Sequence, residues 1–549
     1  MAQRQGGLPA LKVPRGRTAD GAIDYLTLSF AELAAEAGAW QAEFVARGLR
    51  RGDRTLVMVR PGLPLIAAVF ALFGLGAVPV VIDPGMGLKS FLACVARSKP
   101  RALVGIPLAR VVSRVFRRAF RSVEVRIPVA GSPVARGPRE RRSAFAVAPC
   151  AEEELAAVLF TSGSTGAPKG VCYTHGMFAA QVELIRVTYD IQPGERDLPM
   201  LPVFALFNPA LGMTTVVPEI DPTRPAQVDP AKVVQAIRQE GITTSFGSPT
   251  LWWKIAQYCR EHAIVLPTMR RVLSAGAPVP PGLWAALRDI LTHGELHSPY
   301  GATEVLPVSS IRAREVLTET AELTLRGHGT CVGTVIPGNA VKIIALSDQP
   351  IATLAEAREL PPGEIGEIVV RGPTVTHAYD ALPEATAAAK IRGPDGTLWH
   401  RMGDCGRLDA QGRIWFCGRK AERVETADGP MCTEQVEPLF REHPQVARCA
   451  LIGLGQPGAQ TPALVVERAR GKSLPAADDD ALVSALAALA ATHPYARRVR
   501  LVFFHPSLPV DVRHNAKIHR LTLARWAATA KGYPVVDPPV TPAPTPSTS

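Results

Sequence analysis

The chain has 549 residues, which indicates more than one domain, and its 47% hydrophobic and 20% charged residues are typical of a globular protein. Its nine scattered cysteines form no C-x-x-C pair and no His/Cys cluster with zinc spacing, which argues against a disulfide framework and a zinc site. The 61 Lys and Arg residues exceed the 49 Asp and Glu residues by 12, which favours an anionic partner such as a nucleotide, an acyl phosphate or a membrane surface.

The first part of the chain alternates strand-like and helical patterns. Residues 1–20 lack the apolar segment of a secretion signal, so we expect a cytoplasmic protein. Up to about residue 300 we expect helices over 30–49 and 230–241 and strands over 54–59, 77–82, 102–106, 156–160, 243–248 and 270–276. This alternation predicts an α/β fold with a parallel-rich sheet.

One apolar run, from Pro64 to Ile82, is almost long enough to cross a bilayer. Gly74, Gly76 and Pro79 divide it, however, and the division favours a helix of about ten residues followed by a short strand. We therefore expect this run to lie in the core of a soluble domain.

A strongly basic segment follows, from Arg97 to Arg142, with thirteen Lys and Arg residues against two Glu residues. Within it, ARVVSRVFRRAFRS repeats arginine and apolar residues at helical spacing. The pattern favours a core helix with a solvated basic face. A helix that docks on a membrane surface or a partner protein is the alternative.

A loop rich in glycine and hydroxyl groups, LFTSGSTGAPKG from Leu159 to Gly170, follows the strand at 156–160. Its glycines allow a tight turn with exposed N–H groups, and Lys169 adds a positive charge. These N–H groups, hydroxyl groups and the lysine charge suit the binding of a polyphosphate, although their spacing is not that of a Walker A motif. A flexible surface loop is the alternative.

The remaining chain indicates a change of architecture near residue 330. Short strand patterns between 330 and 418 predict a β-rich subdomain, and a new α/β pattern starts after Gly418. We expect a large domain over 1–418, a small domain over 419–532 and a disordered Pro/Ser/Thr-rich tail over 533–549.

Four further motifs occur in a fixed order around the candidate phosphate loop. They are GAVPVVIDP (76–84), HSPYGATEV (297–305), WHRMGDCGRLDAQGRIWFCGRKAERV (399–424) and LPVDVRHNAKIHR (508–520). Together with the loop, they resemble the adenylate-forming superfamily of acyl-CoA synthetases, adenylation domains and luciferases, over nearly the whole chain. The resemblance implies a large N-terminal domain of α/β and β-rich subdomains with a small, mobile α+β domain after it.

The resemblance also implies an ATP- and Mg²⁺-dependent activation of a carboxylic acid, with no nucleic-acid partner. It assigns ATP binding to Thr161, Ser162, Gly163, Ser164, Thr165, Gly166, Lys169, Gly276, Ala277, Pro278, Ser298, Tyr300, Gly301, Thr303, Asp404, Arg419 and Lys517. It assigns catalysis to Lys517, Thr303 and Glu304, and the acyl pocket to Phe204, Ala205, Phe207, Ala275, Gly301 and Pro307.

Each of these implied roles matches the chemistry of its side chain. Tyr300 offers a face to adenine, Thr303 a donor to the α-phosphate, and Glu304 a carboxylate to Mg²⁺, a hard cation. Asp404 accepts from the ribose hydroxyls and Arg419 donates to ribose or phosphate. Because the carboxylate and the α-phosphate are both anions, the Lys517 ammonium suits the charge that develops as they join.

Four positions depart from the usual pattern of the superfamily. The hinge position is Ala421 where Asp or Lys is usual, and Ala516 replaces the Gly before the adenylation lysine. Met402 replaces the Thr or Ser before Gly403, and Ala205 replaces a frequent His at the acyl gate. In the superfamily the small domain rotates about the hinge position, which Ala421 occupies here. Ala205 makes the pocket entrance apolar, which suits an aliphatic chain.

The segment LPVFALFNPALGMTTVVPEIDPTRPAQVDPAKV, from Leu201 to Val233, resembles a narrower subfamily from bacterial long-chain olefin biosynthesis. The resemblance implies activation of a long-chain 2-alkyl-3-hydroxyalkanoic acid, closure to a β-lactone and possible assembly with other enzymes of that biosynthesis. A long-chain fatty acyl-CoA or acyl-AMP ligase shares every motif and is the alternative. A non-enzymatic nucleotide- or membrane-binding protein is the distant alternative, favoured only by the segment 97–142, which carries the expected membrane contact.

Overall fold

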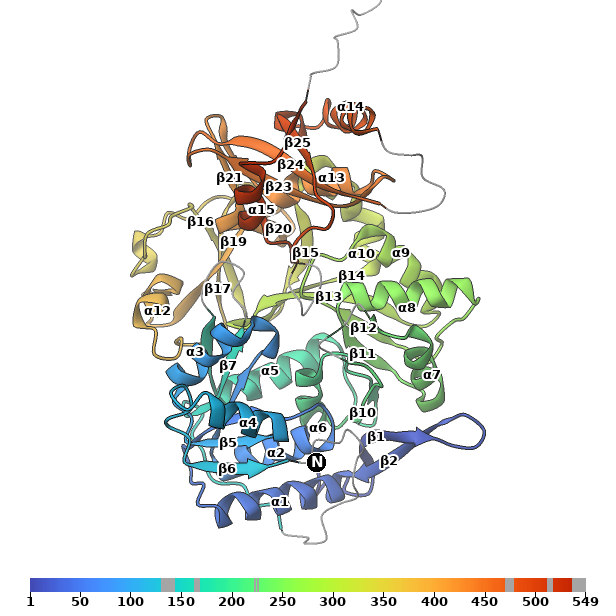
Figure 1. The fold of residues 1–549 in the computed structure, drawn as a ribbon, viewed down its shortest axis with the longest axis vertical. Coiled ribbons are helices and arrows are strands. Elements are labelled where there is room, and N and C mark those ends of the chain that lie inside the picture. The colour runs from blue at the N-terminus through green and yellow to red at the C-terminus, as the bar shows by residue number, and fades with distance from the viewer. Residues whose placement is uncertain are drawn as a thin grey trace, which may run out of the picture.

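The structure, a computed structural model, describes residues 1–129, 144–161, 168–221, 224, 227–469, 478–510 and 517–535. A large part, with the N-terminus at its base, carries a smaller C-terminal part on top, as Figure 1 shows. The fold is therefore the mixed α/β architecture with a small second domain that the sequence predicts.

The first sheet has the strand order β6-β5-β3-β4-β7-β8. Its members are β3 (Arg54–Met58), β4 (Val78–Ile82), β5 (Ala102–Gly105), β6 (Val125–Pro128), β7 (Leu155–Thr161) and β8 (Lys169–Thr174). All neighbours are parallel except β8, which is antiparallel to β7. The predicted parallel strands are confirmed, and β7 and β8 bring both ends of the candidate phosphate loop together.

The apolar run from Pro64 to Ile82 forms a helix and a strand, as predicted. Helix α2 (Leu63–Leu75) ends at Gly76, whose φ of 70° is the left-handed conformation that glycine adopts without strain, and β4 follows. Among the described residues, the structure contains no helix with the length and apolar character of a membrane span.

The second sheet has the order β16-β17-β19-β20-β15-β14-β13-β12-β11-β9-β10-β1-β2, with β18 paired to β19. Its strands are β1 (Pro9–Arg17), β2 (Ile23–Ser29), β9 (Arg196–Asp197), β10 (Thr214–Val216), β11 (Thr244–Gly247), β12 (Arg271–Ser274), β13 (Glu295–Ala302), β14 (Val305–Arg312), β15 (Thr330–Val335), β16 (Ala340–Ile344), β17 (Gly366–Arg371), β18 (Lys390–Arg392), β19 (Leu398–Leu408) and β20 (Arg413–Arg419). Sequence patterns missed the hairpin of β1 and β2.

This sheet changes character at the β13–β14 hairpin. From β10 to β13 its strands are parallel, whereas β13 through β20 pair antiparallel, so the predicted β-rich subdomain continues the α/β sheet. The hairpin turn contains Thr303 and Glu304, which places these two residues at the junction of the two architectures.

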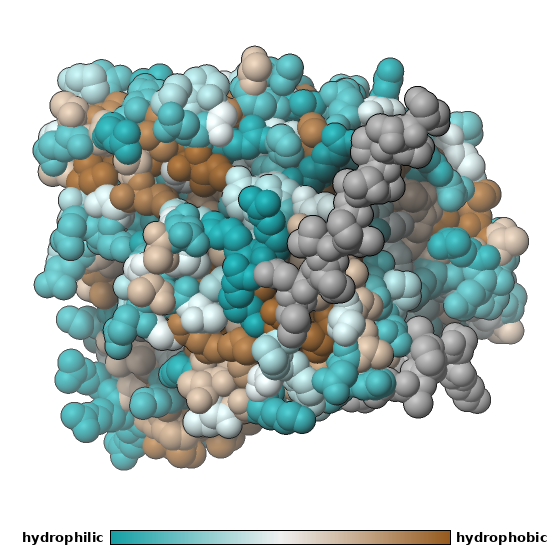
Figure 2. All heavy atoms as spheres, turned by 90° about the horizontal axis from the view of Figure 1, so that it is seen from above, coloured by the Kyte–Doolittle hydropathy of each residue, from teal (hydrophilic) through white to brown (hydrophobic). Residues whose placement is uncertain are grey.

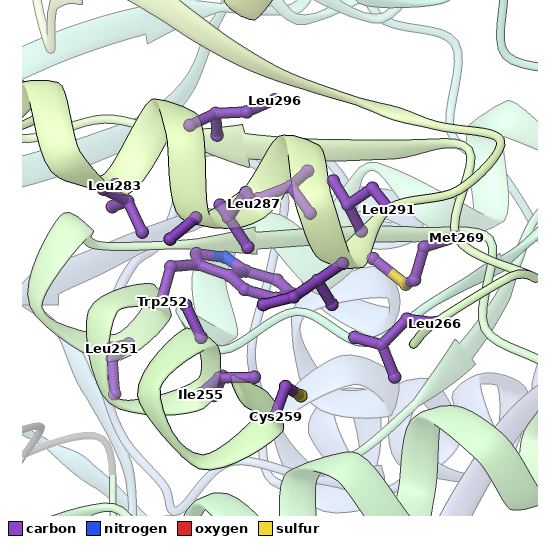
Figure 3. Packing of buried hydrophobic residues seen from close by; sticks show 14 of the residues in the cluster. Leu251, Trp252, Ile255, Cys259, Leu266, Met269, Leu283, Leu287, Leu291 and Leu296 are labelled. Atoms are coloured by element: carbon purple, nitrogen blue, oxygen red, sulfur yellow. The ribbon is translucent and has the colours of Figure 1, made fainter. Parts of the chain in front are cut away.

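Helices cover both sheets of the large part. They are α1 (Phe30–Ala46), α2, α3 (Leu88–Ser98), α4 (Pro107–Val115), α5 (His175–Thr188), α6 (Asn208–Leu211), α7 (Pro230–Glu240), α8 (Pro249–Glu261), α9 (Pro281–Ile290), α10 (Ala313–Glu315), α11 (Ala321–Leu323) and α12 (Pro383–Ala389). The predicted helices at 30–49 and 230–241 correspond to α1 and α7. Figure 3 shows one core, where Trp252 of α8 lies against Leu287 of α9 and is fully buried.

The basic helix differs from its prediction. Helix α4 ends at Val115, so the arginines after it lie outside the helix. Its apolar residues Val111 and Val115 are exposed, whereas the small residues Ala109 and Ser113 are buried. The predicted core contacts and solvated arginines of residues 109–122 are present, since Val112 and Phe116 pack against a core that includes the buried Phe120, but the helix is shorter than predicted and also exposes Val111 and Val115.

The small domain is a separate layered unit. It contains β21 (Val424–Thr426), β22 (Gly429–Met431), β23 (Val446–Leu454), β24 (Thr461–Arg468), β25 (Leu501–Phe504), β26 (Tyr533–Pro534), α13 (Glu437–Arg441), α14 (Asp479–Ala490) and α15 (Arg520–Ala527). Strand β26 pairs with β25, so the start of the predicted tail at residue 533 is too early. Figure 2, seen from above, shows hydrophilic side chains over much of this end and hydrophobic ones gathered between them.

Candidate active site

A buried carboxylate, Asp404, is held by two neighbouring strands of the second sheet. Asp404 of β19 lies opposite Arg419 of β20, and Nη1 of Arg419 donates to its Oδ1 over 2.7 Å. The Tyr300 hydroxyl, from β13, donates to Oδ2 over 2.6 Å. These two bonds fix the orientation of the carboxylate, and a carboxylate retains further lone pairs for ribose hydroxyls.

The small domain contributes charge to the same carboxylate. Burial raises the pKa of Asp404 above its ordinary value, while the charges of Arg419 and Lys517 and the bond from Tyr300 act to lower it. Burial also raises the pKa of Tyr300 well above its ordinary range, so this hydroxyl stays a donor. Lys517 therefore lies close enough to stabilise negative charge beside Asp404.

A second group of residues surrounds Glu304. The Tyr379 hydroxyl donates to Oε1 of Glu304 over 2.6 Å, and Nζ of Lys169 lies 4.7 Å from the centre of the Tyr379 ring. The Tyr173 hydroxyl donates to the backbone carbonyl of Thr303. Tyr379 thus links the strand that leaves the candidate phosphate loop to the carboxylate predicted to hold Mg²⁺. No motif or spacing in the sequence singled out Tyr379.

A buried lysine lies near Glu304 and was also missed. Nζ of Lys390 is 3.3 Å from Oγ1 of Thr376 and 3.1 Å from Nδ1 of His400. Burial lowers the pKa of Lys390 to about 7, although the charge of Glu304 acts to raise it. Burial and the neighbouring Lys390 hold the pKa of His400 well below its ordinary value. The buried amine and imidazole thus share at most one positive charge near neutral pH, because the amine titrates there while the imidazole is neutral.

Replacing Lys390 with Met should change the pH dependence of stability. In the folded protein the pKa of Lys390 is about 7, and its ordinary value is 10.5, so between these values the unfolded chain binds more protons. The free energy of unfolding of the wild type should therefore rise with pH by up to about 1.4 kcal/mol per pH unit relative to Lys390→Met. Urea unfolding at pH 7, 8 and 9 measures this difference. Lys531→Met, at an exposed lysine, is the control, and parallel pH profiles for Lys390→Met and wild type would contradict the expectation.

The candidate phosphate loop is described only at its ends. Thr161 is the last residue of β7 and Lys169 is the first of β8, and the two are paired. Ser162, Gly163, Ser164, Thr165 and Gly166 lie outside the described residues. The geometry therefore places the base of the loop, beside Tyr379, and leaves its phosphate contacts as predictions.

The other predicted nucleotide residues follow two neighbouring parallel strands. Gly276, Ala277 and Pro278 follow β12, and the φ of 97° at Gly276 favours glycine there. Ser298 and Gly301 lie in β13 with Tyr300. A Cβ at Gly301 would approach the backbone oxygen of Val305 to 2.6 Å, so this position requires glycine for packing. Strands β12 and β13 are neighbours, so Gly276, Ala277 and Pro278 follow the strand next to the one that carries Tyr300, the partner of Asp404.

The predicted acyl-pocket residues do not all lie together. Phe204, Phe207 and Ala275 pack in one cluster, in which the Phe204 ring stacks on Phe246 with a centroid distance of 3.8 Å. Ala205 is buried in a different core, which includes residues of α1 and α2. Pro307 lies in β14, where its carbonyl accepts from Asn339 over 2.9 Å, and it belongs to neither cluster. Phe204, Phe207 and Ala275 thus lie together, whereas Ala205 and Pro307 lie apart from them, and the acyl pocket stays a prediction.

Comparisons with known proteins identify the family of the chain. A family model described as AMP-binding enzyme matches residues 2–380. The chain belongs to the AMP-binding enzyme family. It is 47% identical over 531 residues to the olefin beta-lactone synthetase of Xanthomonas campestris pv. campestris, covering 94% of each chain. It is 48% identical over 532 residues to that of Stenotrophomonas maltophilia, covering 94% of this chain and 95% of the other. The predicted superfamily and subfamily resemblances are thus confirmed.

A solved structure shares the fold of this AMP-binding enzyme. ATP-bound MatB from Rhodopseudomonas palustris superposes with a TM-score of 0.75 at 23% identity, covering 95% of this chain and 96% of that one. The predicted fold class, a large mixed α/β part with a smaller C-terminal domain, is therefore confirmed.

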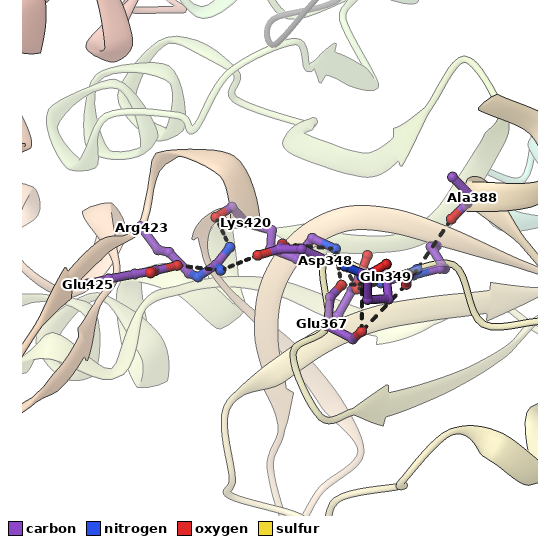
Figure 4. A network of polar contacts seen from close by, with 9 residues as sticks. Asp348, Gln349, Glu367, Ala388, Lys420, Arg423 and Glu425 are labelled. Carbon is purple, nitrogen blue, oxygen red and sulfur yellow. Dashed lines mark hydrogen bonds and ion pairs between the residues drawn. The ribbon is translucent and has the colours of Figure 1, made fainter. Parts of the chain in front are cut away.

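In this AMP-binding enzyme, the residues around Ala421 contact both parts of the chain (Figure 4). Nζ of Lys420 donates to Oε2 of Glu367 over 2.9 Å, and Arg401 holds the same buried carboxylate over 2.6 Å. Arg423 contacts Asp348 over 2.9 Å. Lys420 and Arg423 thus attach the segment around Ala421 to the large part.

Glu422, between them, contacts the small domain instead. Arg520, the first residue of α15, donates from Nη1 to Glu422 over 2.8 Å. Its Nε and Nη2 hold both oxygens of Glu437, over 2.8 Å and 2.7 Å. Burial acts to lower the pKa of Arg520, but the charges of Glu437 and Glu422 outweigh it and raise the pKa. Arg520 therefore connects the segment after Ala421 to the chain that carries Lys517.

Proposed function

We propose that this AMP-binding enzyme activates a long-chain 2-alkyl-3-hydroxyalkanoic acid with ATP and closes the resulting acyl-adenylate to a β-lactone. One observation supports the first step above all others. Asp404, Arg419 and Tyr300 form a single hydrogen-bonded group, and the charge of Lys517 from the small domain reaches it. The high identity to two olefin beta-lactone synthetases supports the second step.

In the first step a carboxylate oxygen of the acid attacks the α-phosphorus of ATP, and the bond to pyrophosphate breaks. The two reacting groups are both anionic, so the site has to supply positive charge where they meet. We assign this charge to Lys517 and place the ribose hydroxyls on Asp404. Arg419 neutralises Asp404 and donates toward ribose or phosphate, and Thr303 donates to the α-phosphate.

Glu304 is the residue that we assign to Mg²⁺. A single carboxylate together with substrate phosphates is a common Mg²⁺ site, and the cation supplies charge neutralisation at the phosphates. Tyr379 donates to Oε1 of Glu304 over 2.6 Å, and burial raises the pKa of this phenol, so the donor persists at working pH. The hydroxyl thereby orients the carboxylate beside Lys169, which we place near the β- and γ-phosphates.

In the second step the 3-hydroxyl oxygen of the substrate attacks the activated carbonyl carbon. The bond from that carbon to the phosphate oxygen breaks, AMP leaves with the electron pair, and the hydroxyl proton passes to a base or to water. A tethered nucleophile has a high effective concentration, so no second substrate has to bind. The stacked Phe204 and Phe246 rings, with Phe207 and Ala275 beside them, offer an apolar surface to the alkyl chains.

We further propose that the small domain, residues 419–532, rotates about Ala421 between the two steps. Lys420 contacts the large part and Glu422 contacts Arg520, so the two neighbours of Ala421 hold different domains. A cytoplasmic location remains an expectation from the sequence of residues 1–20, and assembly with other enzymes of olefin biosynthesis remains an expectation from the resemblance.

The product of the purified protein tests the function. With ATP, Mg²⁺ and a 2-alkyl-3-hydroxy acid, and no CoA, we expect AMP, pyrophosphate and a cis- or trans-β-lactone by mass spectrometry. The matched 2-alkyl acid without the 3-hydroxyl should give bound adenylate or slow hydrolysis, because its adenylate has no internal nucleophile. Rapid CoA-dependent thioester formation from that acid would instead support the acyl-CoA ligase alternative.

A further inference from the structure

Helix α4 (Pro107–Val115) exposes most of its large apolar side chains. Leu108, Val111 and Val115 are spaced at i, i+3 and i+7, which places them on one face of the helix, and they are 66%, 53% and 66% exposed. The side of the helix that faces the first sheet carries Ala109 and Ser113, which are buried, and Val112, which is half-buried and packs against the core. A surface helix usually keeps its aliphatic side chains on the buried face alone, so this second, exposed aliphatic face is suited to contact with something apolar.

Positive charge surrounds this aliphatic face. Arg114 lies in α4 next to Val115, and the chain after the helix carries Arg117, Arg118 and Arg121, all exposed. Within the described parts of the chain, none of these four arginines forms an ion pair with a carboxylate, and the nearby Glu124 is paired with Arg101. The charges are therefore available to an anionic surface.

We propose that α4 and the turn that follows it, residues 107–121, form a docking surface for an anionic lipid membrane. An interfacial segment of this kind inserts aliphatic side chains at the headgroup boundary while arginines contact lipid phosphates. The arginines favour lipid over a protein partner. Several of them lie close together, which matches a continuous anionic surface better than a single acidic patch.

The position of α4 is compatible with turnover on a membrane. Helix α4 packs on β5 and on β6, the edge strand of the first sheet, and in Figure 1 it lies on the lower left, away from the small domain at the top. Contact through this face leaves the small domain clear of the lipid. The inference does not depend on the proposed reaction, because lipid binding is measured without substrate.

Co-sedimentation of the full chain with lipid vesicles tests the inference. Wild type should bind vesicles containing about 30% phosphatidylglycerol in phosphatidylcholine, and binding to phosphatidylcholine alone should be at least about tenfold weaker. Binding should fall with added salt, because the Debye length shortens from about 10 Å at 0.1 M salt to about 3 Å at 1 M.

Two variants and two matched controls separate a local surface from the general positive charge of the protein. The aliphatic variant changes Leu108, Val111 and Val115 to Gln, and its control changes Val45, Val187 and Val265, which are exposed elsewhere, to Gln. The arginine variant changes Arg114, Arg117, Arg118 and Arg121 to Gln, and its control changes the exposed Arg60, Arg238, Arg260 and Arg497 to Gln.

Each α4 variant should weaken binding to the anionic vesicles by about tenfold or more, and each control by less than about twofold. Acid-dependent ATP–pyrophosphate exchange with a soluble short-chain substrate should stay unchanged in all four proteins, which shows that they are folded. Equal losses in variants and controls, or no binding of wild type to anionic vesicles, would overturn the inference. In the latter case an acidic protein partner becomes the better occupant.

Discussion

Lys517→Ala should lower the rate of acid-dependent ATP–pyrophosphate exchange by about 10²–10³-fold while ATP binding is largely retained. The charge of Lys517 acts to lower the pKa of Asp404, the proposed ribose ligand, and we assign the ammonium to the place where the carboxylate and α-phosphate are proposed to meet. Its backbone is well placed to hold it there, because the next residue, Ile518, is buried and bridged to Val510. A donor that is fixed before the reaction stabilises developing charge without reorganising.

The matched control for this variant is Lys531→Ala, at an exposed lysine of the same domain whose Nζ lies 4.6 Å from the centre of the Tyr533 ring. It should exchange like the wild type. Lys517→Arg should recover part of the rate, because it restores the charge with a different shape. If Lys517→Ala exchanged pyrophosphate as fast as wild type, the assignment of the adenylation lysine would be wrong.

Much of the fold was predictable because apolar runs and turn residues determine it locally. The run from Pro64 to Ile82 became a helix and a strand because Gly76 and Pro79 interrupt it, which a sequence shows directly. The hairpin of β1 and β2 was missed because its strands pair with each other and with the distant β10, and long-range pairing leaves a weak local pattern.

The predicted site residues came from ordered motifs, and the missed ones lie outside them. Tyr379 acts on Glu304 and Lys169, and Lys390 contacts Thr376 and His400, but neither Tyr379 nor Lys390 belongs to a motif itself. Helix α4 shows the opposite error. The helical pattern continued to residue 122, but the helix ends at Val115, and the pattern did not reveal that Val111 and Val115 are exposed.

Arg520→Met should destabilise the small domain by about 3–5 kcal/mol, since removing one partner leaves buried charges unpaired. Glu437 is fully buried and Glu422 nearly so, and Arg520 holds both. Arg441 also contacts Glu437 and still pairs with it in the variant, so the lower end of that range applies if this remaining pair compensates the carboxylate. Urea unfolding followed by tryptophan fluorescence measures the loss, and Arg525→Met, at an exposed arginine of the same helix, is the control and should change stability by less than about 0.5 kcal/mol.

The same substitution should also slow adenylation, under conditions where the variant is folded. Arg520 lies three residues after Lys517 and attaches the start of α15 to Glu422, beside the proposed hinge, and to Glu437. Its loss therefore removes both contacts from the segment that carries Lys517. We expect pyrophosphate exchange to fall by about tenfold or more, because misplacing a catalytic group by about 1 Å is enough for a loss of up to about 10²-fold. Arg520→Lys should restore stability only in part, since a lysine cannot hold both oxygens of Glu437 in a fork. A stable Arg520→Met protein with wild-type exchange would show that Glu422 and Glu437 do not position the adenylation lysine.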